Sequence, residues 1–280
     1  MFLLWDQGKP CWFALRLVAI LPLFLVGQAL PALALGARAL CSEEVAYGAP
    51  EPLRPEKRGA LALICKGDAR QDESFFLVAY DKRRRLPLWT AYRLTAADME
   101  AAAQSGITRR SHGSDFQSDS RLHRSARGKA PLAGEDFKGA GLDRGHLAPA
   151  AALAYDAEAY TASFTVANLA LQNAELNRGA WRHLEARVRA WARARGVVYV
   201  ITGVILGRRH SLFIPLDKPE VRIVVPEAFY KLIYDPLRGQ AIAFLYANAP
   251  PAGTKLADAT LSVDQLEDRA GLDFFPLMPA

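Results

Sequence analysis

The chain has 280 residues, 51% of them hydrophobic and 23% charged, a composition typical of a soluble globular protein with a substantial core. Its net charge of +6 would suit a polyanionic partner, but many exported proteins are mildly basic, so charge alone identifies no nucleic-acid-binding protein. The three cysteines form no CxxC pair and no Cys/His cluster, so the sequence does not support a structural zinc site.

Residues 1–40 have the layout of a secretory signal peptide. Lys9 and Arg16 precede a long apolar run at residues 17–35, which ends in small residues with two Ala-x-Ala steps. Such steps are typical of a leader that is cleaved. We therefore expect a mature chain that starts near Cys41 and is secreted or periplasmic.

The alternative to cleavage is an uncleaved membrane anchor, because the apolar run is long. Pro22, Gln28 and Pro31 interrupt this run, which favours cleavage. Leu40 stands before Cys41, where a lipoprotein signal has a small residue, so we do not expect lipidation. The mature chain is expected to have no stable association with a membrane.

Two cysteines remain after the leader is removed. Cys11 leaves with the leader, whereas Cys41 and Cys65 form an even pair in an exported chain. Such a pair predicts one disulfide, which would tie the mature N-terminus to the start of the domain. The alternative is two unrelated thiols.

The first part of the mature chain contains a predicted hairpin and a predicted short helix. Residues 41–60 are rich in Pro, Glu and Arg and are interpreted as an extended lead-in. Two apolar, β-prone runs at residues 74–81 and 86–94 flank four charged residues, which predicts a hairpin with a charged tip. Residues 95–98 begin a helix with a capping-box-like start, and Ser105-Gly106 ends it.

Residues 107–138 are polar and irregular, and a loop this long is usually functional or disordered. The alternative is a solvated surface loop. Residues 178–195 form the clearest predicted helix, because apolar residues recur every three or four positions from Trp181 to Trp191. Strands are predicted at residues 197–206, 221–225, 228–234 and 241–246, and a last helix at residues 262–270. With no internal repeat or linker, residues 41–280 are interpreted as one α+β domain.

The segment Asp143-Arg144-Gly145-His146 carries the residue types that phosphodiester hydrolysis needs. A histidine can deprotonate water, an arginine can bind phosphate, and a glycine leaves backbone room for the substrate. A single histidine is more often structural than catalytic. The residues downstream of His146 favour catalysis.

Asn177 stands where the N-cap of the long helix is predicted, and capping alone is the plain alternative to a functional role. Glu185 follows about 80° around the helix, at the margin of the apolar stripe. A carboxylate there is partly desolvated and needs a cationic or metal-bound partner. His183 points away on the same helix and is interpreted as a surface residue.

These blocks resemble the DNA/RNA non-specific endonuclease family. The family signature Asp-Arg-Gly-His-Leu-x3-Ala is matched by residues 143–151, and a second block, Asn, Gln, Leu-Asn-x-Gly-x-Trp and Glu, by residues 168–185. The first signature is highly specific. Further similarity lies at residues 88–92, 201–203, 225–231, 262–264 and 271–276, so the resemblance covers nearly the whole mature chain.

The resemblance implies an α+β fold of the ββα-metal (His-Me finger) type, with a central antiparallel sheet flanked by helices. It implies that His146 is the general base and Asn177 the direct ligand of a largely hydrated Mg²⁺, for which Mn²⁺ is a substitute. Glu185 would orient a metal-bound water, and Arg144 would bind the phosphate or the developing charge. Asn168 would support the geometry of His146 and the metal.

One upstream arginine of the family has two candidates here, Arg109 and Arg110, because the spacing in this loop departs from the family pattern. The implied activity is Mg²⁺-dependent hydrolysis of DNA and RNA without sugar or sequence preference, leaving 5′-phosphate ends. A homodimer is a further expectation from the family. The alternatives are a nucleic-acid-binding homologue without activity and a phosphodiesterase for another exported substrate.

Overall fold

The computed structural model describes residues 13–14, 36–37, 41–54, 61–68, 73–113, 115–122, 132–207, 211–215 and 217–278. The predicted signal peptide and its cleavage site lie almost wholly outside these residues, as do Arg124, Arg127 and Lys129 of the polar loop. Within the described part of the chain, no helix is long and apolar enough to cross a membrane.

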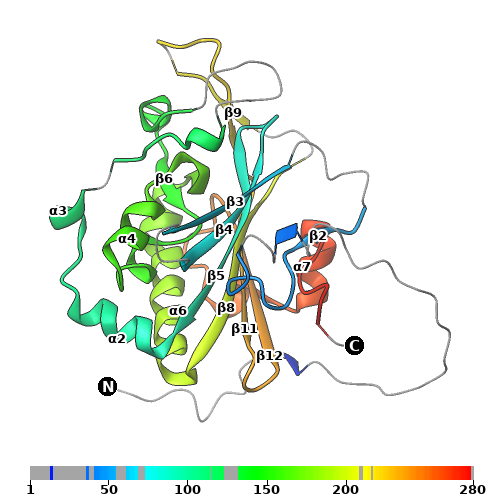
Figure 1. Cartoon of the computed structure of the whole chain (residues 1–280). Helices are drawn as coiled ribbons and strands as arrows, with labels where there is room; N and C mark the ends of the chain where they lie inside the picture. The colour runs from blue at the N-terminus through cyan, green and yellow to red at the C-terminus, as the bar shows by residue number, and fades with distance from the viewer. Residues whose placement is uncertain are drawn as a thin grey trace.

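A central antiparallel sheet of eight strands organises the molecule, in the order β1-β12-β11-β8-β5-β4-β3, with β13 paired to β12. Its strands are β1 (Phe13–Ala14), β3 (Leu61–Asp68), β4 (Glu73–Asp81), β5 (Leu86–Thr95), β8 (Val197–Ile205), β11 (Ala228–Asp235), β12 (Gln240–Ala247) and β13 (Thr260–Leu261). Figure 1 shows the long strands twisting through the middle of the molecule.

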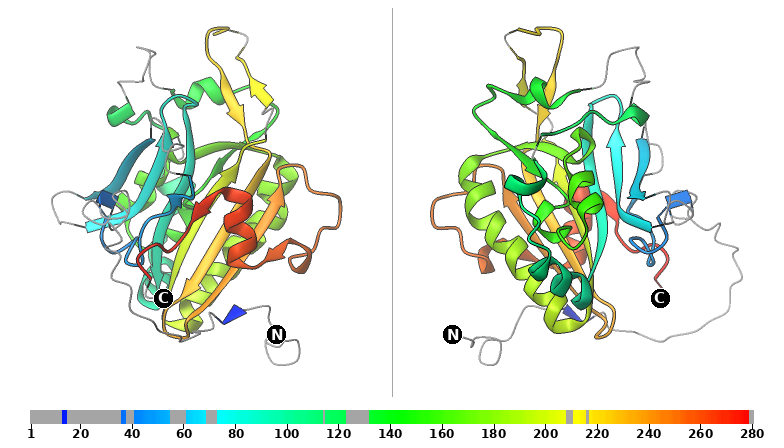
Figure 2. Two further views of the ribbon diagram at one scale, coloured as in Figure 1. Left: turned by 90° about the vertical axis from the view of Figure 1, so that its right-hand side faces the viewer. Right: turned by 60° about the vertical axis from the view of Figure 1, so that its left-hand side comes forward.

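Different elements cover the two faces of this sheet (Figure 1). One face carries α2 (Ala96–Gln104), α4 (Ala157–Ser163) and α6 (Arg182–Arg195), together with the ribbon of β6 (Asp143–His146) and β7 (Leu169–Gln172). The other carries α7 (Val263–Ala270) and the two-strand pair of β2 (Glu51–Pro52) and β14 (Leu272–Asp273). Figure 2 shows α7 lying across that second face.

Shorter elements complete the described chain. They are α3 (Arg109–His112), α5 (Ala174–Leu176), η2 (Ser120–Leu122), η3 (Gly134–Phe137), η4 (Ala150–Ala152), η5 (Val166–Asn168), η6 (Asn177–Trp181), η7 (Ala257–Ala259), β9 (Ser211–Phe213) and β10 (Ile223–Val225). The β9–β10 hairpin projects beyond the end of the sheet in both views of Figure 2.

The sheet is buried on both faces, and alternate residues of a strand belong to different cores. On β11, Phe229 and Ile233 belong to the core under the helices α4 and α6. Tyr230 and Leu232 belong to the core that includes Leu266 of α7. Strands of this kind read as continuous apolar runs, which is why the sequence predicted them without showing which residue faces which core.

Several predicted elements are confirmed. The hairpin predicted at residues 74–94 is β4–β5, with the charged tip as its turn. Thr95 caps α2, accepting from the Asp98 backbone N–H while the Asp98 side chain accepts from the Thr95 N–H. Ser262 caps α7, and Gly271 ends that helix with a left-handed backbone, φ 67°. The α+β architecture is therefore as predicted.

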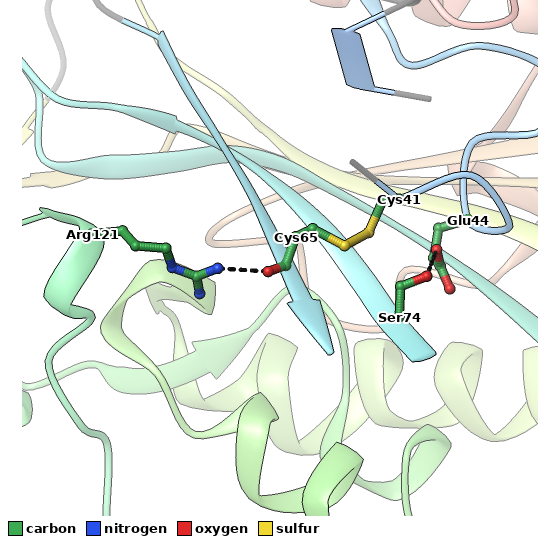
Figure 3. The surroundings of a disulfide bond; sticks show 5 residues. All are labelled: Cys41, Glu44, Cys65, Ser74 and Arg121. Carbon is green, nitrogen blue, oxygen red and sulfur yellow. Dashed lines mark hydrogen bonds between the residues drawn. A yellow bond between two sulfur atoms is a disulfide. The ribbon is translucent and has the colours of Figure 1, made fainter. Parts of the chain in front are cut away.

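Residues 41–54 differ from the extended lead-in that the sequence predicts. Residues 41–47 form turns, and Val45 and Ala49 are buried in the core beside α7. The edge strand β3, which pairs with the next strand along the chain, β4, was not predicted. The predicted disulfide is confirmed: Cys41 is bonded to Cys65 of β3, with the Cα atoms 5.7 Å apart (Figure 3).

Candidate active site

The signature histidine lies on the antiparallel ribbon of β6 and β7, in which His146 pairs with Leu169 and Gly145 with Ala170. A Cβ atom at Gly145 would lie 2.5 Å from Gln172 Oε1 and 2.9 Å from Gln172 Cβ. We had interpreted this glycine as room for the substrate, and that interpretation is wrong. The glycine allows the two strands of the ribbon that carries His146 to pack closely.

His146 opens onto a cleft of about 810 Å³ and is half-buried between aromatic rings. Its ring centroid lies 4.8 Å from that of Phe116 and 4.9 Å from that of Phe164. The Nε2 atom is buried and has no hydrogen-bond partner within the described residues. Burial first, and then the charges of Arg109 and Arg144, lower the pKa of His146 to about 3. The imidazole is therefore neutral at physiological pH.

Ion pairs around the buried carboxylate of Asp119 join the Phe116 loop to the disulfide-bonded strand β3. Asp119 accepts from Lys66 Nζ at 2.9 Å and from Arg121 Nη2 at 2.8 Å. Arg121 Nη1 also donates to the carbonyl oxygen of Cys65 at 2.6 Å (Figure 3). Burial is the largest single effect and raises the pKa of Asp119. The hydrogen bonds and charges of Arg121 and Lys66 together outweigh it and hold this pKa well below its usual range. The cluster fixes the loop that packs against His146.

Asn168 lies beneath the ribbon and is fully buried. Its Oδ1 accepts from the Ala148 N–H at 2.8 Å, and its Nδ2 donates to the carbonyl oxygens of Ala148 and Ser163 at 2.9 and 3.0 Å. The Asn168 backbone carbonyl also accepts from the Leu147 N–H at 3.0 Å. Asn168 thus binds the backbone that follows His146 and supports its position from behind.

Asn177 is not the N-cap that we predicted. Asn173 caps the preceding turn, accepting from the backbone N–H groups of Glu175 and Leu176 at 2.8 and 3.4 Å. Asn177 is helical, with φ −57° and ψ −47°, and begins the π-helical turn η6, which leads into α6 at Arg182. The predicted helix therefore contains a π turn, a feature often found at functional sites.

Asp143 joins the ribbon to this π turn, a role that we did not predict for it. Its carboxylate accepts from Asn177 Nδ2 at 2.8 Å and from Arg178 Nε and Nη2 at 2.8 and 2.5 Å. Arg178 is the main cause of the lowered pKa of Asp143. The bond to Asp143 uses the amide nitrogen of Asn177 and so leaves the amide oxygen for another partner at the cleft.

Glu185 lies on the first turn of α6, half-buried in the wall of the cleft. Burial raises the pKa of Glu185, and the charges of Lys231 and Arg189 oppose this. The prediction of a partly desolvated carboxylate is confirmed. His183 is exposed and does not line the cleft, as predicted for a surface residue.

The cationic side chains of the cleft come from three segments. Arg109 and Arg144 both line it, with the guanidinium carbons 5.8 Å from the Phe164 ring and 5.3 Å from the Phe116 ring. Arg110, the neighbour of Arg109 on α3, is exposed and outside the cleft lining. Of the two candidates for the upstream arginine, the structure therefore places Arg109 at the site. The cleft also contains Arg178 and Arg182, which we did not predict.

The profile of the family described as "DNA/RNA non-specific endonuclease" matches residues 60–280. The chain belongs to this family. Members are metal-dependent nucleases, so the chain is a hydrolase that acts on nucleic acids, and the signature in β6 is the family signature rather than a chance match.

Individual relatives agree with this assignment. The chain is 30% identical to human mitochondrial endonuclease G over 212 residues, which cover 72% of this chain and 67% of the relative. It is 28% identical over 200 residues to a nuclease from Serratia marcescens, covering 68% of this chain and 69% of that protein. The solved structure of an EndoG/EndoGI complex is similar in fold, with a TM-score of 0.63 at 24% identity, covering 90% of this chain and 95% of that chain.

The family fold explains how distant parts of the sequence meet at the cleft. The ribbon β6–β7 and the helical unit η6–α6 form the ββα element of the ββα-metal fold. The ribbon brings His146 and Arg144, the helical unit brings Asn177 and Glu185, and α3 brings Arg109. Of the residues predicted to take part in catalysis, substrate binding or metal binding, only Asn168 and Arg110 do not line this cleft.

Proposed function

We propose that this endonuclease is exported and hydrolyses DNA and RNA without sequence preference in a Mg²⁺-dependent reaction. The observation that carries the proposal is the meeting of a neutral imidazole, an amide oxygen and a half-buried carboxylate in one arginine-lined cleft. In this arrangement His146 is the general base, Asn177 the protein ligand of the ion and Arg144 a phosphate-binding residue.

The donor atoms of the cleft fit a hydrated Mg²⁺. Within the described residues, no three His, Cys, Asp or Glu side chains cluster as a metal cage. An ion that keeps most of its waters needs few protein ligands, and the Asn177 amide oxygen is a hard ligand of the kind that Mg²⁺ prefers. Mn²⁺ is an expected substitute. When bound, the ion would polarise the phosphoryl oxygen and stabilise the leaving 3′ oxygen.

His146 is suited to take a proton from the attacking water. Its ring lines the cleft and is positioned by the ribbon and by packing against Phe116 and Phe164. A pKa near 3 is low for a general base, which works best near the operating pH. A bound phosphate would offset the charges of Arg109 and Arg144 and so raise the pKa of His146 towards that range. Attack at phosphorus with loss of the 3′ oxygen leaves a 5′-phosphate and a 3′-hydroxyl end.

The charges of the cleft support binding to the phosphate backbone. Arg109, Arg144 and Arg182 line it, and none of them forms an ion pair within the described residues. Contacts to phosphate position a nucleic acid without reading its bases, so little sequence preference is expected. Glu185 would accept a hydrogen bond from a water of the hydrated ion and thereby orient it.

Digestion of plasmid DNA and ribosomal RNA, with Mg²⁺ and with EDTA, tests this function. We expect both substrates to be cut internally only with the divalent ion, and the fragments to carry 5′-phosphates that a phosphatase removes. Binding without cleavage would identify a nucleic-acid-binding homologue instead. Cleavage of a nucleotide or lipid diester but of neither polymer would identify a phosphodiesterase for another exported substrate.

The proposed export rests on the layout of residues 1–40 and on the Cys41–Cys65 disulfide. Disulfides persist in oxidising compartments. Intact-mass analysis of protein from a periplasmic or culture fraction should show a chain that starts near Cys41 with no free thiol. A full-length mass would contradict export with cleavage. Light scattering of the same sample tests the expected homodimer.

A further inference from the structure

Lys231 is a fully buried lysine in the middle of the sheet. It lies on β11 between Phe229 and Ile233, on the face that packs against α6. Its direct cross-strand neighbour on β8 is Thr202. Apolar residues usually occupy such positions, so the presence of a buried ammonium group requires an explanation.

The polar partners of Lys231 are neutral. Its Nζ donates to Thr202 Oγ1 at 2.5 Å and to Tyr92 Oη at 3.2 Å, and it lies 4.8 Å from the centre of the Trp181 ring. Two hydroxyls and a ring face solvate an ammonium. They supply no negative charge, and no ion pair within the described residues includes Lys231. Burying an ammonium in this way is unfavourable unless a counter-charge lies nearby.

Glu185 of α6 supplies that counter-charge. It lies one helical turn after Trp181, whose ring contacts Lys231, and side chains four residues apart lie side by side on a helix. Burial lowers the pKa of Lys231, and the Glu185 charge is the group that opposes this. Burial raises the pKa of Glu185, and Lys231 is the first of the charges that oppose it. Each group thus stabilises the charged form of the other.

We propose that Lys231 is a positioning residue of the active site, whose buried ammonium holds the Glu185 carboxylate charged and oriented at the cleft. This inference rests on the proposed function for the role of Glu185 in catalysis. A hydrophobic residue of similar volume would fill the same space without the desolvation penalty of a charge. The ammonium is therefore explained by the Glu185 carboxylate, which lies beside the Trp181 ring that Lys231 contacts.

A charge-balance experiment tests this role, using Lys231→Met, Glu185→Gln and the double variant. Lys231→Met leaves a half-buried carboxylate without its main cation, so we expect the melting temperature to fall by about 10 °C. The double variant, in which both charges are absent, should regain most of that loss. Thr202→Val is the matched control: it keeps the volume of the side chain and both charges but removes one hydroxyl that accepts from Lys231, so its effect should be additive with Glu185→Gln.

Kinetic measurements distinguish a role of Lys231 in positioning Glu185 from a role in packing alone. At saturating Mg²⁺, Lys231→Met should lower kcat on plasmid DNA roughly 10- to 100-fold with little change in KM, because Glu185 acts in the chemical step. Additive melting effects, or a Lys231→Met enzyme with wild-type kcat, would overturn the proposal. If Lys231→Met does not fold, a folded double variant supports the proposal and an unfolded one overturns it.

The same experiment keeps the two hypotheses apart. The melting cycle needs neither Mg²⁺ nor substrate, so it tests the charge pair alone. A wild-type protein that does not cleave nucleic acid would contradict the proposed function, whereas coupling in the melts would still establish that Lys231 and Glu185 act as a pair.

Discussion

Strand β11 buries two charged side chains, Lys231 and Asp235, and their surroundings differ. Asp235, at the end of the strand, accepts from Arg195 at 2.5 Å and from Arg238 at 3.1 Å, and also from two backbone N–H groups. Lys231, in the middle, is bonded to neutral hydroxyls, and its counter-charge is at the cleft. A buried charge that is directly paired within the fold, such as Asp235, stabilises the structure. A buried charge whose partner lines the cleft, such as Lys231, can instead influence catalysis through that partner.

The same contrast separates other residues of the cleft from the rest of the fold. His146 lines the cleft without a hydrogen bond from the described residues to its buried Nε2, and Glu185 lines it with a raised pKa, whereas Asn168 has its amide fully engaged with backbone atoms. Groups left incompletely satisfied by the protein are those available to water, ion or substrate. Substitution of His146 should reduce activity at nearly constant stability. Substitution of Asn168 should reduce stability, and it should reduce activity as well because Asn168 supports the backbone that follows His146.

The largest expected effect on activity is that of His146→Ala. Because the base acts in the chemical step, we expect turnover to fall by about 10² to 10⁴ while affinity for nucleic acid and the melting temperature change little. Turnover and equilibrium binding in EDTA are measured on the same preparations. His183→Ala, exposed and outside the cleft, is the control. If His183→Ala lost activity and His146→Ala did not, the assignment of the base would be wrong.

Asn177→Asp should come next. A second carboxylate would face Asp143, and the donor that bonds to Asp143 Oδ2 would be absent. We expect activity to fall and the Mg²⁺ dependence to change, because the ligand carries a new charge. Calorimetric titration with Mg²⁺ and thermal melts are the measurements. Asn173, the residue that does cap the turn, supplies the contrast: Asn173→Asp should retain both activity and stability. Unchanged activity and Mg²⁺ dependence in Asn177→Asp would show that the ion is held elsewhere.

Asp235→Asn tests whether the buried charge of Asp235 stabilises the fold without affecting the cleft. Removing one partner of a buried ion pair typically costs about 3 to 5 kcal/mol, because the remaining charge stays buried. We expect denaturant unfolding to show a loss of this order, with kcat of the folded protein unchanged. A large fall in kcat at full stability would mean that Asp235 acts on the cleft as well, and the contrast with Lys231 would not hold.

The pH dependence should reflect the lowered pKa of His146, about 3 against an ordinary 6.5. A base must be unprotonated, so kcat/KM should fall with acidification only well below pH 6.5. Arg109→Gln removes a cation that lowers this pKa and should therefore move the acid limb to higher pH. Between the two pKa values the unfolded chain binds more protons, so the stability contribution of neutral His146 falls as pH decreases through this window. An acid limb at the ordinary histidine value would contradict the burial seen here.

The smallest effect is expected for Arg182→Gln, which should weaken binding of duplex DNA a few-fold. Arg182 lines the cleft, whereas Arg187 is exposed on the same helix outside the cleft lining. Losing one phosphate contact should reduce the slope of log affinity against log salt by about 1. Binding isotherms in EDTA at several salt concentrations measure this slope. Equal effects of Arg182→Gln and Arg187→Gln would indicate a diffuse charge effect instead of a contact in the cleft.

Local patterns in the sequence were enough to predict the β4–β5 hairpin, the capped helices α2 and α7, and the signature around His146. Each depends on residues a few positions apart, whose spacing reports on strand or helix geometry. The paired cysteines likewise predicted the disulfide, because two cysteines allow only one connection. The residue types of the site were therefore predictable, as was its chemistry by resemblance to the family.

Long-range contacts decided the rest. The sequence places Asn177 at the expected start of the long helix, where it resembles an N-cap. In the structure Asn177 begins the π turn η6 instead and is bonded to Asp143, 34 residues away, which the local sequence does not reveal. Arg109 and Arg110 are indistinguishable in sequence, and only the orientation of α3 places Arg109 in the cleft. Lys231 lies in an apolar run that any buried strand could have. Its ammonium acquires a partner only when β11 packs beneath α6, because electrostatic interactions depend on distance in space and not on separation along the chain.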